Sequence, residues 1–228
     1  MSIFENYSGI CEEIKNITAS SGRNANEIAI IAISKTFTSS TIQEAIDQGI
    51  KVFGENKVQE AKQKVSELKG EFSMHLVGHL QSNKAKEAVK IFDLIHSIDK
   101  FSTAVKLDEE AKKINKVQNI LVQVNTSGED TKSGIEPGEV IKLCRDIIPL
   151  KNIDLIGLMT IGPFTEDIMR IRESFKTLKK LLNETNSILG TNMKELSMGM
   201  SSDYRLAIEE GATMLRIGSA IFGQRDYK

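Results

Sequence analysis

Ile28-Ala29-Ile30-Ile31-Ala32-Ile33-Ser34-Lys35 is an uninterrupted apolar run that ends in a serine and a lysine. The run is short, rich in β-branched residues and free of polar alternation, which is typical of a strand covered on both faces, as in a parallel sheet. Parallel α/β folds place their chemistry at the carboxyl ends of such strands. Lys35 therefore stands where a functional side chain is expected, although lysines that simply reach solvent from a strand end are common.

Short apolar segments of the same kind recur along the chain, each followed by polar or glycine-containing sequence. We expect eight strands, at Ile28–Ser34, Lys51–Gly54, Met74–Val77, Leu94–Ile98, Ile120–Asn125, Leu155–Thr160, Glu195–Met198 and Thr213–Ile217. Helical stretches separate them, at Thr41–Gln48, Lys57–Leu68, Ser82–Lys90, Phe101–Asn115, Pro137–Ile148, Glu166–Leu189 and Tyr204–Glu209. This alternation predicts parallel strands joined by crossover helices.

Eight such units that close on themselves form an α/β fold of the TIM type, a (β/α)8 barrel, which needs roughly 200 to 250 residues. The last strand is followed only by Gly218–Lys228, which is too short for a full final helix. We expect the amphipathic N-terminal helix Ile3–Ala19 to complete the outer ring instead. A doubly wound open sheet is the alternative. No linker or low-complexity tract divides the chain, so we expect residues 1–228 to form a single domain.

Composition narrows the classes of partner and compartment. The chain has 30 Lys and Arg against 31 Asp and Glu, a net charge of -1, which favours a small molecule over nucleic acid or an anionic membrane. Its two cysteines, Cys11 and Cys144, lie far apart in helical segments, which indicates reduced thiols. Because there is no signal-peptide pattern and no apolar run near the ~20 residues of a membrane span, we expect a cytoplasmic protein.

The chemistry expected of Lys35 is nucleophilic. Burial disfavours the charged form of lysine, so a buried strand-end lysine can be a neutral amine that attacks a carbonyl and forms a Schiff base. Two late segments, Ser197–Asp203 and Arg216–Ser219, supply glycines and serine hydroxyls. Glycines let the backbone approach an anion, and the loops after strands seven and eight are the usual phosphate site of these barrels. For Ser201–Asp203, a cap on the following helix is the alternative interpretation.

Other polar side chains at strand ends are candidates for the same pocket. Arg216 closes an apolar strand, so its permanent charge is expected to face the barrel mouth, where it would meet a phosphate, a heterocyclic nitrogen or a carboxylate such as Glu55. His79 follows a glycine at a strand end, whereas His96 is expected to be a core histidine with a hydrogen-bond partner. His75 and His79 lack the glutamate of a helical zinc motif, so we expect no metal site.

Several long motifs occur in an order that is typical of one family. They are Ala32–Thr36, Phe53–Asn56, His75–Lys84, Ile95–Asp99, Gln123–Gly128, Lys132–Gly134, Gly157–Thr160, Leu196–Asp203 and Arg216–Gly223. The chain resembles, over nearly its whole length, the single-domain pyridoxal-phosphate-binding proteins of the pyridoxal phosphate homeostasis type, which are built on the alanine racemase N-terminal barrel.

The resemblance implies a cofactor and a site. Lys35 would hold pyridoxal 5'-phosphate as a Schiff base, and Arg216 would face the pyridine nitrogen. The phosphate would be bound by three residues, Ser201, Gly218 and Ser219. Three more match family segments that line the same mouth, namely Asn56, His79 and Met159.

Two positions depart from the family pattern. Lys57 stands where many relatives have a tyrosine, and Phe37 stands where some have a second lysine two places after the Schiff-base lysine. Phe37 puts in doubt a transfer of the cofactor between lysines at that position, so Lys84 or Lys132 would have to serve.

The resemblance leaves activity open, because the same barrel forms half of the two-domain amino-acid racemases. Racemisation needs an acid–base group on each face of the cofactor, and those enzymes take the second from a tyrosine of their extra domain. Here Tyr7, Tyr204 and Tyr227 lie in the N-terminal helix, at a helix start and in the C-terminal tail. An arginine at the pyridine nitrogen also weakens the cofactor as an electron sink.

We therefore expect a non-catalytic, monomeric protein that buffers or delivers pyridoxal phosphate and contacts apo-enzymes transiently. A weak racemase is one alternative, and a cofactor-free Schiff-base aldolase that acts on a sugar phosphate is another.

Overall fold

The fold is a closed barrel of parallel strands. The computed structural model describes residues 2–129 and 132–223, and in it the strands pair in the order β1 to β8, with β8 returning to β1. Their bounds are β1 Ala29–Ile33, β2 Val52–Glu55, β3 Ser73–Leu76, β4 Leu94–Ile98, β5 Gln118–Gln123, β6 Ile153–Met159, β7 Glu195–Met200 and β8 Met214–Ile217. The predicted TIM-type barrel is confirmed, and the open-sheet alternative is wrong.

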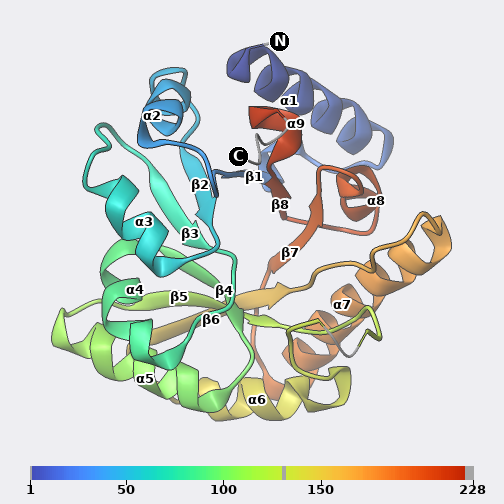
Figure 1. The fold of residues 1–228 in the computed structure, drawn as a ribbon. Helices are drawn as coiled ribbons and strands as arrows, with labels where there is room; N and C mark the ends of the chain where they lie inside the picture. Colours follow the sequence, from blue (N-terminus) through green and yellow to red (C-terminus); the bar gives the residue numbers. More distant parts are fainter. Residues whose placement is uncertain (1, 130–131, 224–228) are drawn as a thin grey trace.

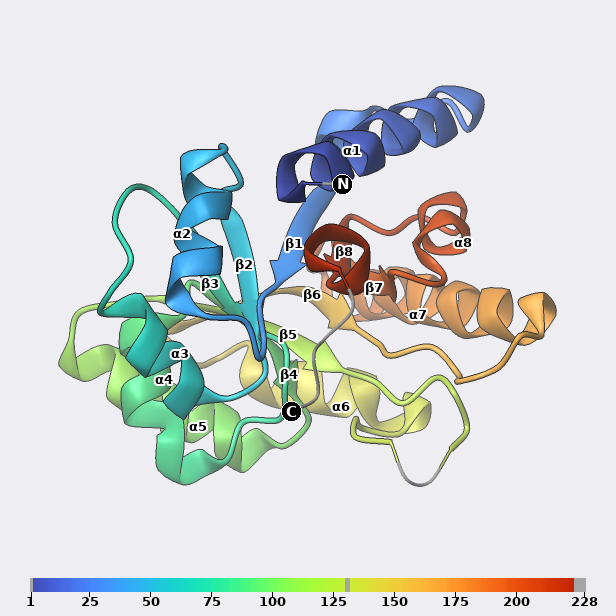
Figure 2. The ribbon, with the colours of Figure 1, turned by 45° about the horizontal axis from the view of Figure 1, so that its top comes forward.

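Helices surround this barrel in both ribbon views (Figures 1 and 2). They are α1 Ile3–Ser20, α2 Ser39–Asp47, α3 Val58–Val65, α4 Ala85–Ile91, α5 Phe101–Lys113, α6 Val140–Ile147, α7 Ile168–Leu189, α8 Tyr204–Glu209 and α9 Ser219–Phe222. Short 3-10 turns precede three elements, at Ala25–Glu27, Ser82–Lys84 and Pro137–Glu139. Within the described residues, none of these helices has both the length and the apolar character needed to cross a membrane.

The N-terminal helix completes the outer ring, as expected. A capping box begins α1, because the Ser2 hydroxyl accepts from the Glu5 amide while the Glu5 carboxylate accepts from the Ser2 amide. The helix packs against α8 and α9, and Asn6 donates a 2.9 Å hydrogen bond to the carbonyl of Ile221 in α9. Since α9 has only 4 residues, α1 covers the face that a full eighth helix would cover.

Hydrophobic side chains fill two layers. The larger layer lies between the strands and the helices. The smaller cluster contains Ile31, Ile33, Val77, Leu94, Leu121, Met159 and Met214. Because side chains alternate along a strand, Ile31 and Ile33 on β1 share one face, and the register pairs Ile31 with Arg216 on β8. This face leads to the carboxyl ends of β1 and β8, where Lys35 and Gly218 follow.

Candidate functional site

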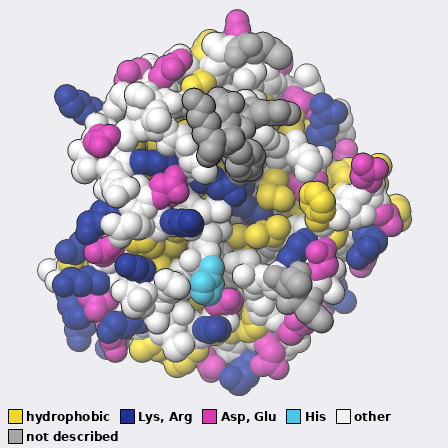
Figure 3. Space-filling model, in the orientation of Figure 1, with side chains coloured by type: hydrophobic (Ala, Val, Ile, Leu, Met, Phe, Trp, Pro, Cys, Tyr) yellow, Lys and Arg dark blue, Asp and Glu magenta, His cyan; other side chains and the backbone are white. Residues whose placement is uncertain are grey.

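A cavity of about 410 Å³ opens at the carboxyl end of the barrel. Lysine, arginine and hydrophobic side chains surround a central hollow on this face (Figure 3). Strand β8 and the segments after β1, β2, β3, β7 and β8 contribute seven of the predicted residues to its lining, namely Lys35, Asn56, His79, Ser201, Arg216, Gly218 and Ser219. These residues lie far apart in the sequence, and the closed barrel brings them to one rim.

Met159 is the predicted residue that does not line this cavity. Its side chain is fully buried and belongs to the cluster that also contains Ile33 and Val77. Ile33 and Val77 do line the cavity. Met159 therefore supports the apolar floor from within the barrel and does not face the cavity itself.

Lys35 is held in a tight turn directly after β1. The amide of Phe37 donates to the carbonyl of Ser34 at 3.1 Å, which closes the four-residue turn around Lys35 and Thr36. Thr36 has a φ of 73°, a left-handed value that β-branched residues rarely adopt. Lys35 itself is half-buried. The chain thus bends sharply where β1 reaches the cavity, and Lys35 is on the bend.

Backbone amides and hydroxyls after β7 and β8 converge beside the cavity. The amides of Gly218 and Ala220 both point to Oγ of Ser201, at 3.3 and 3.4 Å. Ser201 and Ser219 line the cavity beside Gly218. Convergent amides and hydroxyls of this kind donate to the oxygens of a phosphate or carboxylate.

The end of β7 and the turn that follows it depend on Gly199. Its φ is 92°, and a Cβ at this position would lie 2.6 Å from Cβ of Ala207 in α8. The carboxylate of Asp203 accepts from the amide of Met200 at 2.6 Å and so closes the same turn. Asp203 is the N-cap residue of α8, but its side chain makes no capping hydrogen bond to that helix. The predicted cap is therefore present in position, while its carboxylate serves the turn that carries Ser201.

Arg216 is buried with its charge directed at the cavity. Nη1 donates to Oγ of Ser197 and Nη2 to the carbonyl of Thr160, each at 2.7 Å. Burial lowers the pKa of Arg216 to about 10, and the charge of Asp203 opposes that shift, so the guanidinium stays protonated at pH 7. The ion pair with Glu55 that the sequence allowed is not formed, because the Glu55 carboxylate pairs with Lys64.

A chain of hydrogen bonds continues from Arg216 through the barrel. Nδ1 of His96 lies 2.9 Å from Oγ of Ser197, and its Nε2 lies 3.1 Å from Nδ1 of His75. Burial lowers the pKa of His75 to about 4 and holds the pKa of His96 well below its usual value, so both rings are neutral at pH 7. The prediction of a core His96 with a hydrogen-bond partner is confirmed. Among the described residues, no cluster of three or more His, Cys, Asp or Glu is placed to hold a metal ion.

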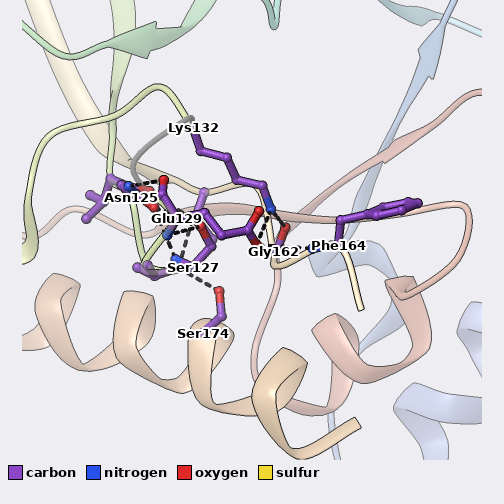
Figure 4. A network of polar contacts seen from close by, with 10 residues as sticks. Asn125, Ser127, Glu129, Lys132, Gly162, Phe164 and Ser174 are labelled. Atoms are coloured by element: carbon purple, nitrogen blue, oxygen red, sulfur yellow. Dashed lines mark hydrogen bonds and ion pairs between the residues drawn. The ribbon is translucent and has the colours of Figure 1, made fainter. Parts of the chain in front are cut away.

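Lys132 enters the cavity from the loop after β5. Its ammonium donates to Glu129 at 3.0 Å and to the carbonyl of Gly162 at 2.7 Å, and the Phe164 amide lies 3.4 Å from the same Glu129 oxygen. Figure 4 shows Lys132 reaching across from one loop to the other. These contacts join the loops after β5 and β6.

The two residues that depart from the family pattern, Lys57 and Phe37, lie outside the cavity lining, and so does Lys84. Lys57 is exposed and Lys84 half-buried, and neither lines the cavity. Phe37 stacks on Phe222 of α9, with ring centroids 4.9 Å apart. Of the lysines considered for a transfer of the cofactor, only Lys132 therefore lines this cavity in the described part of the chain.

The sequence reasoning missed two residues near Lys35 and the cavity. Gln123 lines the cavity and donates to the carbonyl of Ser133 at 2.9 Å. The sequence feature that could have indicated Gln123 is a polar side chain at the end of the fifth strand. Lys64 is buried next to the Lys35 turn. The sequence feature that could have indicated it is the position of a lysine on the same helical face as Val58 and Ala61.

The fold and its rim of polar side chains define a class. Residues 14–226 match the family model described as the alanine racemase N-terminal domain. The alanine racemase of Clostridium difficile 630 superposes with a TM-score of 0.77 at 15% identity, over 98% of this chain and 58% of that one. At this identity the likeness shows the fold alone.

Closer relatives define the family. The pyridoxal phosphate homeostasis protein of Aquifex aeolicus is 39% identical over 228 residues, the full length of both chains. PipY of Synechococcus elongatus, solved with pyridoxal phosphate bound, has a TM-score of 0.82 at 34% identity, over 92% of this chain and 100% of that one. The chain belongs to the pyridoxal phosphate homeostasis protein family.

Proposed function

We propose that this protein binds pyridoxal 5'-phosphate in the cavity at the carboxyl end of the barrel and holds it as a Schiff base on Lys35. The observation that carries the proposal is the convergence of three chemically different groups on one cavity. They are the amine of Lys35, the buried guanidinium of Arg216, and the hydroxyls and amides around Ser201 and Gly218. The names of the relatives and the bound ligand of PipY point the same way.

The residues of the cavity fit each part of this cofactor. A phosphate suits the hydroxyls of Ser201 and Ser219. Oγ of Ser201 accepts from the amides of Gly218 and Ala220, which leaves its proton to donate to a phosphate oxygen. A pyridine nitrogen suits a permanently charged donor such as Arg216. The aldehyde suits a lysine amine, whose nitrogen bonds to the aldehyde carbon while one water leaves. When bound, pyridoxal phosphate supplies that reactive aldehyde and a conjugated ring.

The groups around the ring favour a carrier over an enzyme. Arg216 stays charged and only donates hydrogen bonds, so it disfavours protonation of the ring nitrogen that strong electron withdrawal requires. A racemase also needs a second acid–base group opposite Lys35. Tyr7 does not line the cavity, and the hydroxyl of Tyr204 donates to Glu13. Tyr227 lies outside the described residues.

We infer that the protein buffers or delivers the cofactor. In this account it is a monomeric, single-domain cytoplasmic protein, and its contact with apo-enzymes that use pyridoxal phosphate is transient. The half-buried position of Lys132 on the cavity wall makes it the lysine best placed to receive the cofactor from Lys35 during release.

Absorption spectroscopy with a transfer assay tests this function. Purified protein titrated with pyridoxal phosphate should develop the yellow band of a Schiff base, and Lys35→Ala should not. The loaded protein should restore activity to an apo-enzyme, while D- and L-alanine should not interconvert in its presence. Steady interconversion would reject the carrier account in favour of a racemase. Absence of the band in the wild type would reject cofactor binding and favour the cofactor-free aldolase.

A further inference from the structure

A buried lysine lies beside the turn that carries Lys35. Lys64 is on the inner face of α3, and its side chain is only 9% exposed. Its ammonium donates to the carbonyl of Ser34 at 2.9 Å, to Oε1 of Glu55 at 2.8 Å and to Oε1 of Glu60 at 2.7 Å. Because an ammonium group has three protons, these bonds use every donor that Lys64 has.

The same cluster holds the residues on both sides of Lys35. On one side, the Ser34 hydroxyl donates to Oε1 of Glu55 at 2.6 Å. On the other side, the Thr36 amide donates to Oε1 of Glu60 at 2.7 Å. Ser34 and Thr36 are therefore tied to one ammonium group, either directly or through a single carboxylate.

The turn needs such support because its conformation is costly. A positive φ in the third residue of a turn normally calls for glycine, yet Thr36 is β-branched and has a φ of 73°. Strained residues of this kind persist only where their surroundings over-determine them. The hydrogen bonds from the Thr36 amide and to the Ser34 carbonyl supply that constraint.

The ion cluster is hard to explain by stability alone. Glu55 is fully buried, and its second oxygen has no hydrogen-bond partner in the described residues. Taking charges out of water costs free energy that a buried pair often fails to recover, and apolar residues of similar size are frequently as stable. Val58 and Ala61 occupy the same face of α3 and pack without charge. The charged cluster is therefore better explained by the geometry that it imposes on the turn.

We propose that Lys64, together with Glu55 and Glu60, is a positioning cluster that holds the Ser34–Phe37 turn in the one conformation that directs the Lys35 amine into the cavity. This inference rests on the proposed function, in which that amine attacks the cofactor aldehyde. Lys64 does not line the cavity, and the residues proposed to hold the phosphate and the ring nitrogen, Ser201, Gly218 and Arg216, lie in or directly after β7 and β8. Loss of the cluster should therefore slow attack by Lys35 and leave the other contacts with the cofactor intact.

Four variants separate positioning from general stability. Lys64→Met removes the donors at similar side-chain length, and Glu60→Ala removes the acceptor of the Thr36 amide from a side chain that is 26% exposed. The matched control is Lys116→Met, because Lys116 is half-buried and its ammonium also donates to backbone carbonyls, those of Val89 and Phe92. The double variant Lys64→Met/Thr36→Gly relieves the strain, because glycine adopts a positive φ without a steric penalty.

Two measurements are made on each variant under conditions where circular dichroism shows it folded. The first is the rate at which the Schiff-base band appears on mixing with pyridoxal phosphate. The second is the affinity for pyridoxine 5'-phosphate, which has the same ring and phosphate but no aldehyde. Lys64→Met should slow the formation of the Schiff-base band by about tenfold to a hundredfold, the usual effect of a displaced reactive group. Its affinity for pyridoxine 5'-phosphate should stay within about twofold of the wild type, the margin of a remote substitution.

The controls complete the test. Glu60→Ala should also slow band formation, Lys116→Met should match the wild type, and Thr36→Gly should restore much of the rate lost in Lys64→Met. Equal rates in the wild type, Glu60→Ala and Lys64→Met would overturn the inference while leaving the proposed function in place. Parallel loss of rate and of pyridoxine 5'-phosphate affinity would overturn it as well, because the pocket itself would have collapsed. A wild type without any band would overturn the proposed function, and this inference with it.

Discussion

Arg216 and His96 meet at a single hydroxyl group, that of Ser197, which lies 2.7 Å from Nη1 of the arginine and 2.9 Å from Nδ1 of the histidine. Arginine only donates, so the hydroxyl oxygen accepts from Arg216 and its proton is directed to His96. His96 then carries its proton on Nε2 and donates it to Nδ1 of His75, 3.1 Å away. One always-charged residue at the cavity thus sets the tautomers of two buried histidines.

Ser197→Ala should destabilise the protein by about 2–3 kcal/mol, because it leaves a buried donor on Arg216 and a buried acceptor on His96 without their shared partner. Urea unfolding at pH 7 measures the loss. Ser66→Ala is the control, since Ser66 is exposed and its hydroxyl donates to the carbonyl of Gln63. A change below about 0.5 kcal/mol in Ser197→Ala, the range of ordinary surface substitutions, would show that the chain of hydrogen bonds contributes little.

Stability should fall on mild acidification because of His75. Burial lowers its pKa from 6.5 to about 4 in the folded protein, so the unfolded chain binds more protons between these values. The stability that the lowered pKa of His75 contributes is fully present above pH 6.5 and is lost progressively as the pH falls toward 4. At pH 5 it amounts to about 2 kcal/mol of lost stability for this one group.

Urea midpoints measured at pH 7 and pH 5 test this, with His75→Gln as the comparison. The variant should lose the share of the pH dependence that His75 contributes, because glutamine does not titrate, while the lowered pKa of His96 leaves a remainder. An unchanged pH dependence in His75→Gln would assign the effect to other groups.

Gly78→Ala should weaken the cofactor site. A Cβ at Gly78 would lie 2.2 Å from the carbonyl oxygen of Asn56 and 2.8 Å from its Cα, so the backbone that carries Asn56 must move. Gly78 and Asn56 both line the cavity. We expect affinity for pyridoxal phosphate to fall about tenfold, which corresponds to 1.4 kcal/mol.

Gly138→Ala is the matched control for Gly78→Ala. A Cβ at Gly138 would meet nothing within 4 Å, so this variant should bind as the wild type does. Wild-type affinity in Gly78→Ala would mean that the loop after β2 yields without cost and that Asn56 is not held by this contact.

The barrel was predictable because each strand is an apolar run that ends at a polar or glycine-containing segment. The strand Leu94–Ile98 and the helix Tyr204–Glu209 agree with the structure at both ends. Most other ends agree or differ by one or two residues, as at β5, which begins at Gln118 and not at Ile120. The largest differences are three residues, as at the helix predicted to end at Leu68, which ends at Val65. Hydrogen-bond pairing with the next strand sets the strand ends, and Gln118 pairs with Ile153 although its side chain is polar.

The site was predictable where residues directly follow strands, and less so elsewhere. Lys35, His79 and Arg216 stand at strand ends, so the barrel itself brings them together. Lys64 lies on helix α3, nine residues after Glu55 in the sequence. Its contact with Glu55 beside the Lys35 turn depends on how α3 packs on the barrel, which the sequence pattern does not indicate. Met159 was predicted from its family motif, but its side chain lies in the apolar cluster with Ile33 and Val77 and does not line the cavity.

The most direct test of the account is to identify the lysine that carries the cofactor. The protein is loaded with one equivalent of pyridoxal phosphate and reduced with borohydride, and its peptides are mapped by mass spectrometry. We expect a label on Lys35 alone in the wild type and no label at that position in Lys35→Ala. A label spread over surface lysines, or concentrated on a lysine outside the cavity, would contradict it.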